Sequence, residues 1–173
     1  EVGIGGRYDA TSAVDPVASA VTSVSLEHTE LLGDTVEEIA RDKAQVAPRD
    51  GPLVTGATGD ALDAIRTVTD VVAVGPDDAD VIAVEHGMER AIESNVSVTG
   101  RDWSLETNLQ LLGKHQAENA GVAATLARQV ADVPTSDIAA GLRQATLPGR
   151  FEILDSDPMA VLDGSHNPGA MST

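Results

Sequence analysis

Hydrophobic and polar residues alternate along this chain in short blocks, and the period of the alternation changes from block to block. Apolar runs at 20–26, 52–55 and 71–74 predict buried strands. Apolar positions within 34–46 and 59–68 recur with the period of a helix. A helix between two strands is typical of a βαβ unit, so we expect an α/β fold with a doubly wound parallel sheet.

The second half of the chain predicts fewer elements. Helices are expected at 115–130 and 136–142, and 95–99 alternates as a half-buried strand does. The polar stretch 77–93 predicts no defined element.

The turn sequence LPGR separates this part from two further strands, expected near 151–154 and 159–162. We therefore expect a domain boundary just after residue 145. Residues 1–145 would belong to one domain, and residues 146–173 would begin a second.

Composition narrows the possible partners. The 28 acidic residues against 11 basic ones give a formal net charge of −17. Nucleic acids are bound by clustered Lys and Arg, so we expect no nucleic-acid partner. Scattered acids suit high salt, where charges are screened within about 3 Å at 1 M, and we expect a halophilic protein over a merely acidic one. The sequence has no cysteine and no apolar run near the roughly 20 residues of a membrane span, so we expect a cytoplasmic location.

The helix expected at 34–46 carries a lysine within its apolar face. Lys43 lies at i+7 of a series whose apolar members at i, i+3, i+4 and i+8 are Val36, Ile39, Ala40 and Ala44. A lysine in such a place extends its amine to the surface, pairs with an acid, or is kept neutral for chemistry. The pattern leaves these alternatives open.

Polar residues follow the strand expected at 20–26, beginning with Glu27 and His28. Open α/β sheets bind ligands at the carboxyl ends of their strands. His28 is therefore a candidate ligand or acid–base group, with an ordinary loop histidine as the alternative. Glu1 could end a neighbouring strand in the same way, and a carboxylate with an imidazole could hold a divalent cation, although Mg²⁺ prefers oxygen ligands.

Two further motifs carry polar residues that suit a site. KHQAEN begins a helix on which His115 and Asn119 share a face, and Asn119 continues an apolar stripe toward Val130. VLDGSHNP ends a strand in Asp163 and His166. Each motif is also compatible with a purely structural role. The glycine-rich GIGGRYD and TGATGDA lack the spacing of dinucleotide and phosphate loops and predict tight turns, and PDDAD lacks that of a calcium loop.

Five segments occur together in this sequence: EVGIGGRYDAT, LEHTELLGDTVEEIARDKAQV, LLGKHQAENA, LPGRFEIL and LDGSHNPGA. As a set they resemble the folylpolyglutamate synthase and dihydrofolate synthase family, ATP-dependent ligases related to the Mur ligases. The resemblance implies that residues 1–145 are the later part of the central parallel-sheet ATPase domain. It implies that residues 146–173 start a carboxy-terminal Rossmann-like domain, and that this chain is a fragment without the P-loop, inactive by itself.

The resemblance also implies a reaction. The family phosphorylates a folate carboxylate with ATP and then adds L-glutamate to the acyl phosphate, with Mg²⁺ as the metal. The expected partners are ATP, L-glutamate and a folate or dihydropteroate, with no nucleic acid, no membrane and a monomeric parent protein. Two alternatives stay open: a Mur-type ligase acting on a nucleotide-linked precursor, and a binding piece without catalytic activity.

Several residues correspond to functional positions of the family. Glu1 and His28 resemble its magnesium ligands, and Lys43 resembles its carbamylated lysine. The apolar face around Lys43 supplies a reason for that modification, because carbon dioxide reacts only with a neutral amine. The other implied roles are ATP binding by Asn119, Arg150 and Asp163, a catalytic part for Lys43 and His166, and substrate binding near the pterin by Asp9.

The helical pattern and the resemblance together orient one helix. We expect Lys43 to point toward His28 and Glu1 beneath the carboxyl edge of the sheet. Arg41 and Asp42, on the same helix, are expected to face solvent.

Overall fold

The computed structural model describes residues 2–14, 16–89 and 93–165. Eight strands and five α-helices are present in these ranges. Six strands form one sheet in the order of the chain: β1 (Ser19–Val21), β2 (Leu53–Thr55), β3 (Val71–Gly75), β4 (Val81–Glu89), β5 (Glu93–Thr99) and β6 (Ser104–Leu109). The helices are α1 (Thr29–Leu32), α2 (Val36–Lys43), α3 (Gly59–Arg66), α4 (Lys114–Val130) and α5 (Thr135–Gln144), with short 3-10 helices at Ala10–Ala13 and Ala44–Val46.

The sheet is parallel in its first half and antiparallel in its second. Strands β1 to β4 are parallel to their neighbours, whereas β4, β5 and β6 are antiparallel. Val74 and Gly75 at the end of β3 pair with Val81 and Ile82 at the start of β4, so β4 continues beyond the carboxyl edge of the parallel strands. The α/β class and the parallel sheet are confirmed, and the antiparallel half is an addition that the sequence did not predict.

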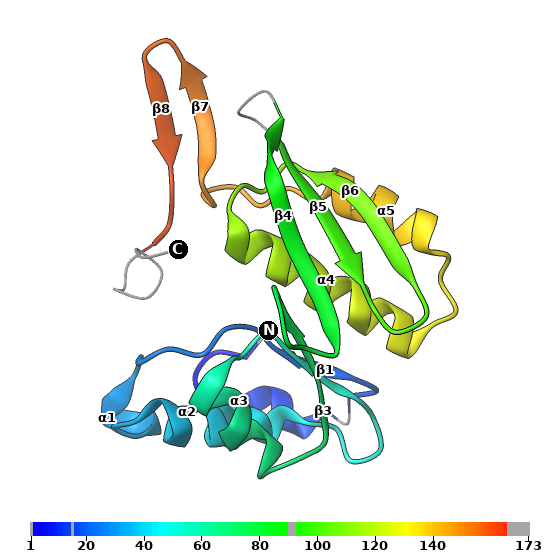
Figure 1. The fold of residues 1–173 in the computed structure, drawn as a ribbon. Helices are drawn as coiled ribbons and strands as arrows, with labels where there is room; N and C mark the ends of the chain where they lie inside the picture. Colours follow the sequence, from blue (N-terminus) through cyan, green and yellow to red (C-terminus); the bar gives the residue numbers. More distant parts are fainter. Residues whose placement is uncertain (1, 15, 90–92, 166–173) are drawn as a thin grey trace.

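Helices cover both faces of the parallel strands (Figure 1). The neighbouring residues Leu53 and Val54 of β2 are both buried, but they belong to two separate core clusters because successive side chains of a strand point to opposite faces. One cluster joins α2 and α3 to β1 and β2. The other joins α4 and Ile138 of α5 to strands from β2 to β6. The doubly wound arrangement is therefore present.

Close packing of α4 on the sheet depends on small side chains. Gly121 lies where an added Cβ would be 2.6 Å from the Cβ of Ala83 and 2.7 Å from Cγ1 of Val74. Ala117, Ala120 and Ala124 are also buried on this helix. The helix can therefore approach the strands closely enough to cover five of them.

Strands β7 (Glu152–Ser156) and β8 (Met159–Leu162) form a separate antiparallel hairpin after α5 (Figure 1). Within the described ranges, neither strand pairs with the six-stranded sheet. None of the helices in those ranges is long and apolar enough to cross a membrane.

Candidate active site at the carboxyl edge of the sheet

The loops that follow β1, β2 and β3 meet at one edge of the sheet. The Gly56 amide, just after β2, donates to the Val21 carbonyl at the end of β1 over 3.0 Å. A pocket of about 540 Å³ opens at this edge. Its lining includes the hydroxyls of Ser23 and Thr58 and three carboxylates, which are Asp60, Asp77 and Glu118. This is where open α/β sheets bind their ligands.

Glu118 is the carboxyl that α4 contributes to this pocket. Burial raises the pKa of the Glu118 carboxyl, because its charged form loses contact with water, while the nearby His115 opposes the change. Glu118 therefore keeps its proton to a higher pH than an exposed glutamate does. Glu118 lies within the KHQAEN motif, but no role was predicted for it from the sequence.

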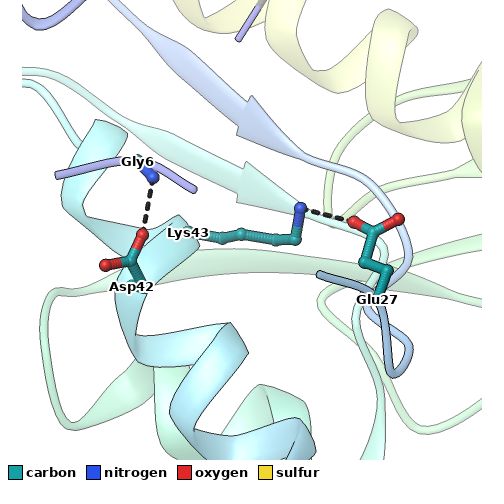
Figure 2. A network of polar contacts seen from close by, with 4 residues as sticks. All are labelled: Gly6, Glu27, Asp42 and Lys43. Atoms are coloured by element: carbon teal, nitrogen blue, oxygen red, sulfur yellow. Dashed lines mark hydrogen bonds and ion pairs between the residues drawn. The ribbon is translucent and has the colours of Figure 1, made fainter. Parts of the chain in front are cut away.

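Lys43 ends α2 and pairs with Glu27 on the loop after β1 (Figure 2). The Nζ of Lys43 lies 2.7 Å from Oε1 of Glu27, and the two side chains are 21% and 31% exposed. Its helical neighbours Ile39, Ala40 and Ala44 are fully buried, as the apolar pattern predicted. The lysine thus lies at the rim of the core and reaches a carboxylate.

His28 directly follows that carboxylate. It is exposed, it adopts a left-handed backbone conformation with φ of 48°, and it precedes the first turn of α1. The structure thus brings Lys43 to the residue before His28. Glu1, the predicted second metal ligand, and His166, the predicted catalytic residue of the VLDGSHNP motif, lie outside the described residues.

The orientation predicted for Asp42 is wrong. Arg41 is exposed as expected, but Oδ1 of Asp42 accepts a hydrogen bond of 2.8 Å from the Gly6 amide (Figure 2). The helical pattern places Asp42 on the polar side of α2, yet the glycine segment from the start of the chain packs there. Helical periodicity predicts which side of α2 is polar, but it cannot predict that a segment 36 residues away packs against that side.

Asp9 holds the same glycine segment from its other end. Its carboxylate accepts from the Gly3 amide at 3.0 Å, from the Thr11 amide at 2.9 Å and from the Thr11 hydroxyl at 2.7 Å. These donors, those of Thr11 foremost, lower the pKa of Asp9 to about 2. The amides of Gly3 and Gly6 both donate to carboxylates, which fits the prediction of a tight turn and not of a phosphate cradle.

Asn119 does not lie on the buried stripe that the sequence predicted. Both Asn119 and Ala123 are exposed, and the Asn119 amide donates to Oε1 of Gln116 over 3.2 Å. The buried face of α4 is offset by one or two residues and is formed by Ala117, Ala120, Gly121 and Ala124. The period was correct and its phase was wrong. Because the Asn119 side chain is exposed, a ligand can still reach it.

Arg150 and Asp163 come together across the β7–β8 hairpin. Oδ2 of Asp163 accepts from the Phe151 amide at 2.7 Å, next to Arg150, and the Gly164 amide donates to the Gly149 carbonyl at 2.8 Å. Hydrogen bonds from the side chain and backbone of Ser165 and from the Phe151 amide lower the pKa of Asp163. The LPGR and DGS loops therefore form one joined corner.

The described residues supply only part of a cation site. No group of three or more His, Asp or Glu side chains in residues 2–14, 16–89 and 93–165 is arranged to hold a metal ion. His28 offers an imidazole, while the Glu27 carboxylate beside it is paired with Lys43. These donors alone do not fit a complete magnesium site.

Comparisons with known proteins agree with this fold and these motifs. No model of a known protein family matches the chain. A probable bifunctional folylpolyglutamate synthase/dihydropteroate synthase from Halobacterium salinarum is 61% identical over 98% of this chain. Its counterpart from Haloferax volcanii is 55% identical, and the dihydrofolate synthase/folylpolyglutamate synthase of Escherichia coli is 35% identical, each again over 98% of the chain. The chain spans 21% of the length of the first two relatives and 39% of the third.

Solved structures give the same result. An FPGS–AMPPCP–folate complex matches 99% of the chain with a TM-score of 0.89 and 28% identity, over 44% of its own length. The E. coli FolC in complex with DHPP and ADP matches 98% of the chain with a TM-score of 0.81 and 29% identity, over 40% of its length.

The similarities extend over nearly the whole chain, and they define its class as an α/β chain that matches part of each of these longer proteins. The chain belongs to the folylpolyglutamate synthase and dihydrofolate synthase family, as its five motifs predicted.

Proposed function

We propose that the protein to which this chain belongs joins L-glutamate to a folate or to dihydropteroate at the expense of ATP. The observation that carries this proposal is the match, along 98% of the chain at 61% identity, to a probable bifunctional folylpolyglutamate synthase/dihydropteroate synthase. The match to structures containing an ATP analogue with folate, or ADP with DHPP, supports ATP and a pterin-containing acceptor as substrates.

The reaction proceeds through an acyl phosphate. A carboxylate oxygen of the acceptor attacks the γ-phosphorus of ATP, and ADP leaves. The amine of glutamate then attacks the acyl carbon, loses a proton, and displaces phosphate, which carries the former carboxylate oxygen. Because both steps develop negative charge on phosphate oxygens, the protein contributes mainly alignment and positive charge.

The chain's residues have separate parts in this proposal. Asn119 faces the base of ATP, and Arg150 and Asp163 lie toward its phosphates. His166 takes the catalytic role that the resemblance implies. The hydrogen bond from the Phe151 amide to Asp163 supports this role, because it fixes the loop that bears Arg150. Asp9 orders the segment beside the pterin through its bonds to Gly3 and Thr11.

Magnesium and a carbamate on Lys43 are the finer parts of the proposal. His28 and Glu1 are the proposed metal ligands. The contact of Lys43 with Glu27, one residue before His28, supports a place for Lys43 beside that site. Since the described donors do not complete the site, no step above depends on the metal.

We also propose that the whole protein carries a dihydropteroate synthase part. The relatives that are 61% and 55% identical bear both names. The domain boundary after residue 145 is proposed on separate grounds, namely that β7 and β8 pair with each other and leave the main sheet.

A ligation assay with the full-length protein tests the proposed function. ATP, Mg²⁺ and glutamate are supplied with dihydropteroate, with a reduced folate, or with a nucleotide-linked peptidoglycan precursor, at high salt. We expect a product longer by a glutamyl residue with one or both pterin acceptors. Turnover of the peptidoglycan precursor alone would favour the Mur-type alternative, and no turnover with any acceptor would favour a binding piece.

A further inference from the structure

The last turn of α2 contacts two loops that are far apart in the sequence (Figure 2). Asp42 accepts a hydrogen bond from Gly6, which lies 36 residues earlier, and the contact is half-buried. The next residue, Lys43, pairs with Glu27. One helical turn therefore touches both the glycine segment, residues 3–6, and the loop after β1.

The glycine segment approaches α2 more closely than any other residue type allows. A Cβ on Gly6 would lie 2.6 Å from the Asp42 carbonyl oxygen and 2.7 Å from the Lys43 carbonyl oxygen. Gly5 has a positive φ of 68°, and a Cβ there would collide with the Asp42 carboxylate of α2 and lie 2.8 Å from Cδ2 of Leu32 at the end of α1. Backbone thus packs on backbone, and the Asp42 carboxylate is the group that fixes the register between them.

The opposite end of the glycine segment is anchored separately, because the Gly3 amide donates to Asp9. The Gly3–Asp9 bond holds residues 3–9 together as one loop, and the Gly6–Asp42 bond joins that loop to α2. The hydrogen bond of Asp42 is charge-assisted and therefore stronger than a neutral one.

We propose that Asp42 is a positioning residue that fixes the glycine segment against α2, so that this segment and the Lys43–Glu27 pair keep one relative placement. Asp42 acts through its neighbours and does not touch substrate. Its effect on turnover rests on the proposed function, because the segment leads to Asp9 and the helix carries Lys43. Misalignment of groups that act together slows a reaction more than it weakens binding.

Three variants of the full-length protein test this proposal. Asp42→Ala removes the acceptor, Asp42→Asn keeps an oxygen in its place, and Arg41→Ala is a control on the exposed side of the same turn. Hydrogen exchange measured by mass spectrometry on peptides covering residues 3–8 reports on the segment without any ligand. We expect exchange about tenfold faster in Asp42→Ala, and within about threefold of wild type in the other two variants.

Steady-state kinetics supply the second readout. In Asp42→Ala, kcat should fall about tenfold while the KM for ATP changes less than about twofold, and Asp42→Asn should restore most of kcat. Unchanged exchange in Asp42→Ala, an Asn variant as impaired as the Ala variant, or faster exchange with normal kcat would each overturn the positioning role. If the wild-type protein ligates nothing, the proposed function fails, while the exchange data still decide whether Asp42 holds the segment.

Discussion

In the structure the Lys43 amine pairs with the Glu27 carboxylate. The family resemblance implies instead that this amine is carbamylated. A single ion pair that is still in contact with water stabilises a protein by about 1 kcal/mol or less, so we expect pairing of Lys43 with Glu27 to contribute little to stability. A guanidinium can form the same ion pair but cannot be carbamylated. The Lys43→Arg variant therefore separates ion pairing with Glu27, which it keeps, from carbamylation, which it loses.

We predict that Lys43→Arg in the full-length protein unfolds at nearly the wild-type temperature and loses most ligation. Lys43→Ala should lose ligation as well, and short added carboxylates should restore part of it by replacing the carbamate oxygens. Melting curves and steady-state rates measured on the same preparations check both statements. Near-normal turnover of the arginine variant would leave Lys43 as an ordinary partner of Glu27.

Asp9 gives a prediction for pH dependence. Its pKa in the folded chain, about 2, lies below its ordinary value of 3.8 because Thr11 and Gly3 donate hydrogen bonds to the charged form. The stabilisation from Asp9 is thus fully present above about pH 4 and is lost as the pH falls toward 2. An NMR titration of the Asp9 carboxyl carbon should give a midpoint near 2. Asp9→Asn should lower the melting temperature more at pH 6 than at pH 2, where about half of the Asp9 carboxyl is already protonated. A midpoint near 4 would contradict these hydrogen bonds.

Apart from Asn119, where the phase of the helix was wrong, the residues that the sequence misjudged are those whose surroundings come from distant segments. The apolar face of α2 was predictable from spacing, and Ile39 and Ala44 are buried as expected. Asp42 was not, because its partner Gly6 belongs to another loop. The role of Glu27 was also hidden, since nothing in the local pattern shows which lysine it meets.

At the scale of elements, α4 and α5 offer a matched pair of glycines. Gly121 faces the sheet, where an added methyl group would collide with Ala83 and Val74, whereas an added Cβ on Gly141 of α5 has no atom within 4 Å. We predict that Gly121→Ala destabilises the full-length protein by about 1–3 kcal/mol through overpacking. Gly141→Ala should stabilise it by about 0.5–1 kcal/mol through helix propensity.

Denaturant unfolding of the two variants at one salt concentration measures these effects. Equal stabilities would mean that α4 does not approach the strands as closely as described. A stabilised Gly121→Ala variant would contradict the close packing of α4 on the sheet.

Most helices were predictable and two strands were not. The sequence placed α2, α3, α4 and α5 within a few residues because their apolar positions repeat with a helical period. Strand β6 carries a signal that was overlooked, with Leu105, Thr107 and Leu109 alternating as buried positions. Strand β4 begins with the apolar run VIAV at 81–84, which was also overlooked because the residues on both sides of it are mostly polar. Its later part carries polar residues such as His86, which contacts Ser97.

At the scale of the whole molecule, the formal net charge of −17 on this chain predicts strong repulsion between acidic side chains. Repulsion between acids destabilises the folded chain at low salt, and screening removes it. We predict that the melting temperature rises by several degrees between about 0.1 M and 2 M KCl. A melting temperature that falls with salt would contradict this prediction.

Transfer of oxygen tests the central proposal most directly. The acceptor is prepared with ¹⁸O in its carboxylate and incubated with the full-length protein, ATP, Mg²⁺ and glutamate at high salt. An acyl phosphate intermediate predicts that the released phosphate carries one labelled oxygen for each glutamate added, and that Lys43→Arg releases almost none. Unlabelled phosphate, or no glutamylated product from either pterin acceptor, would contradict the proposed function.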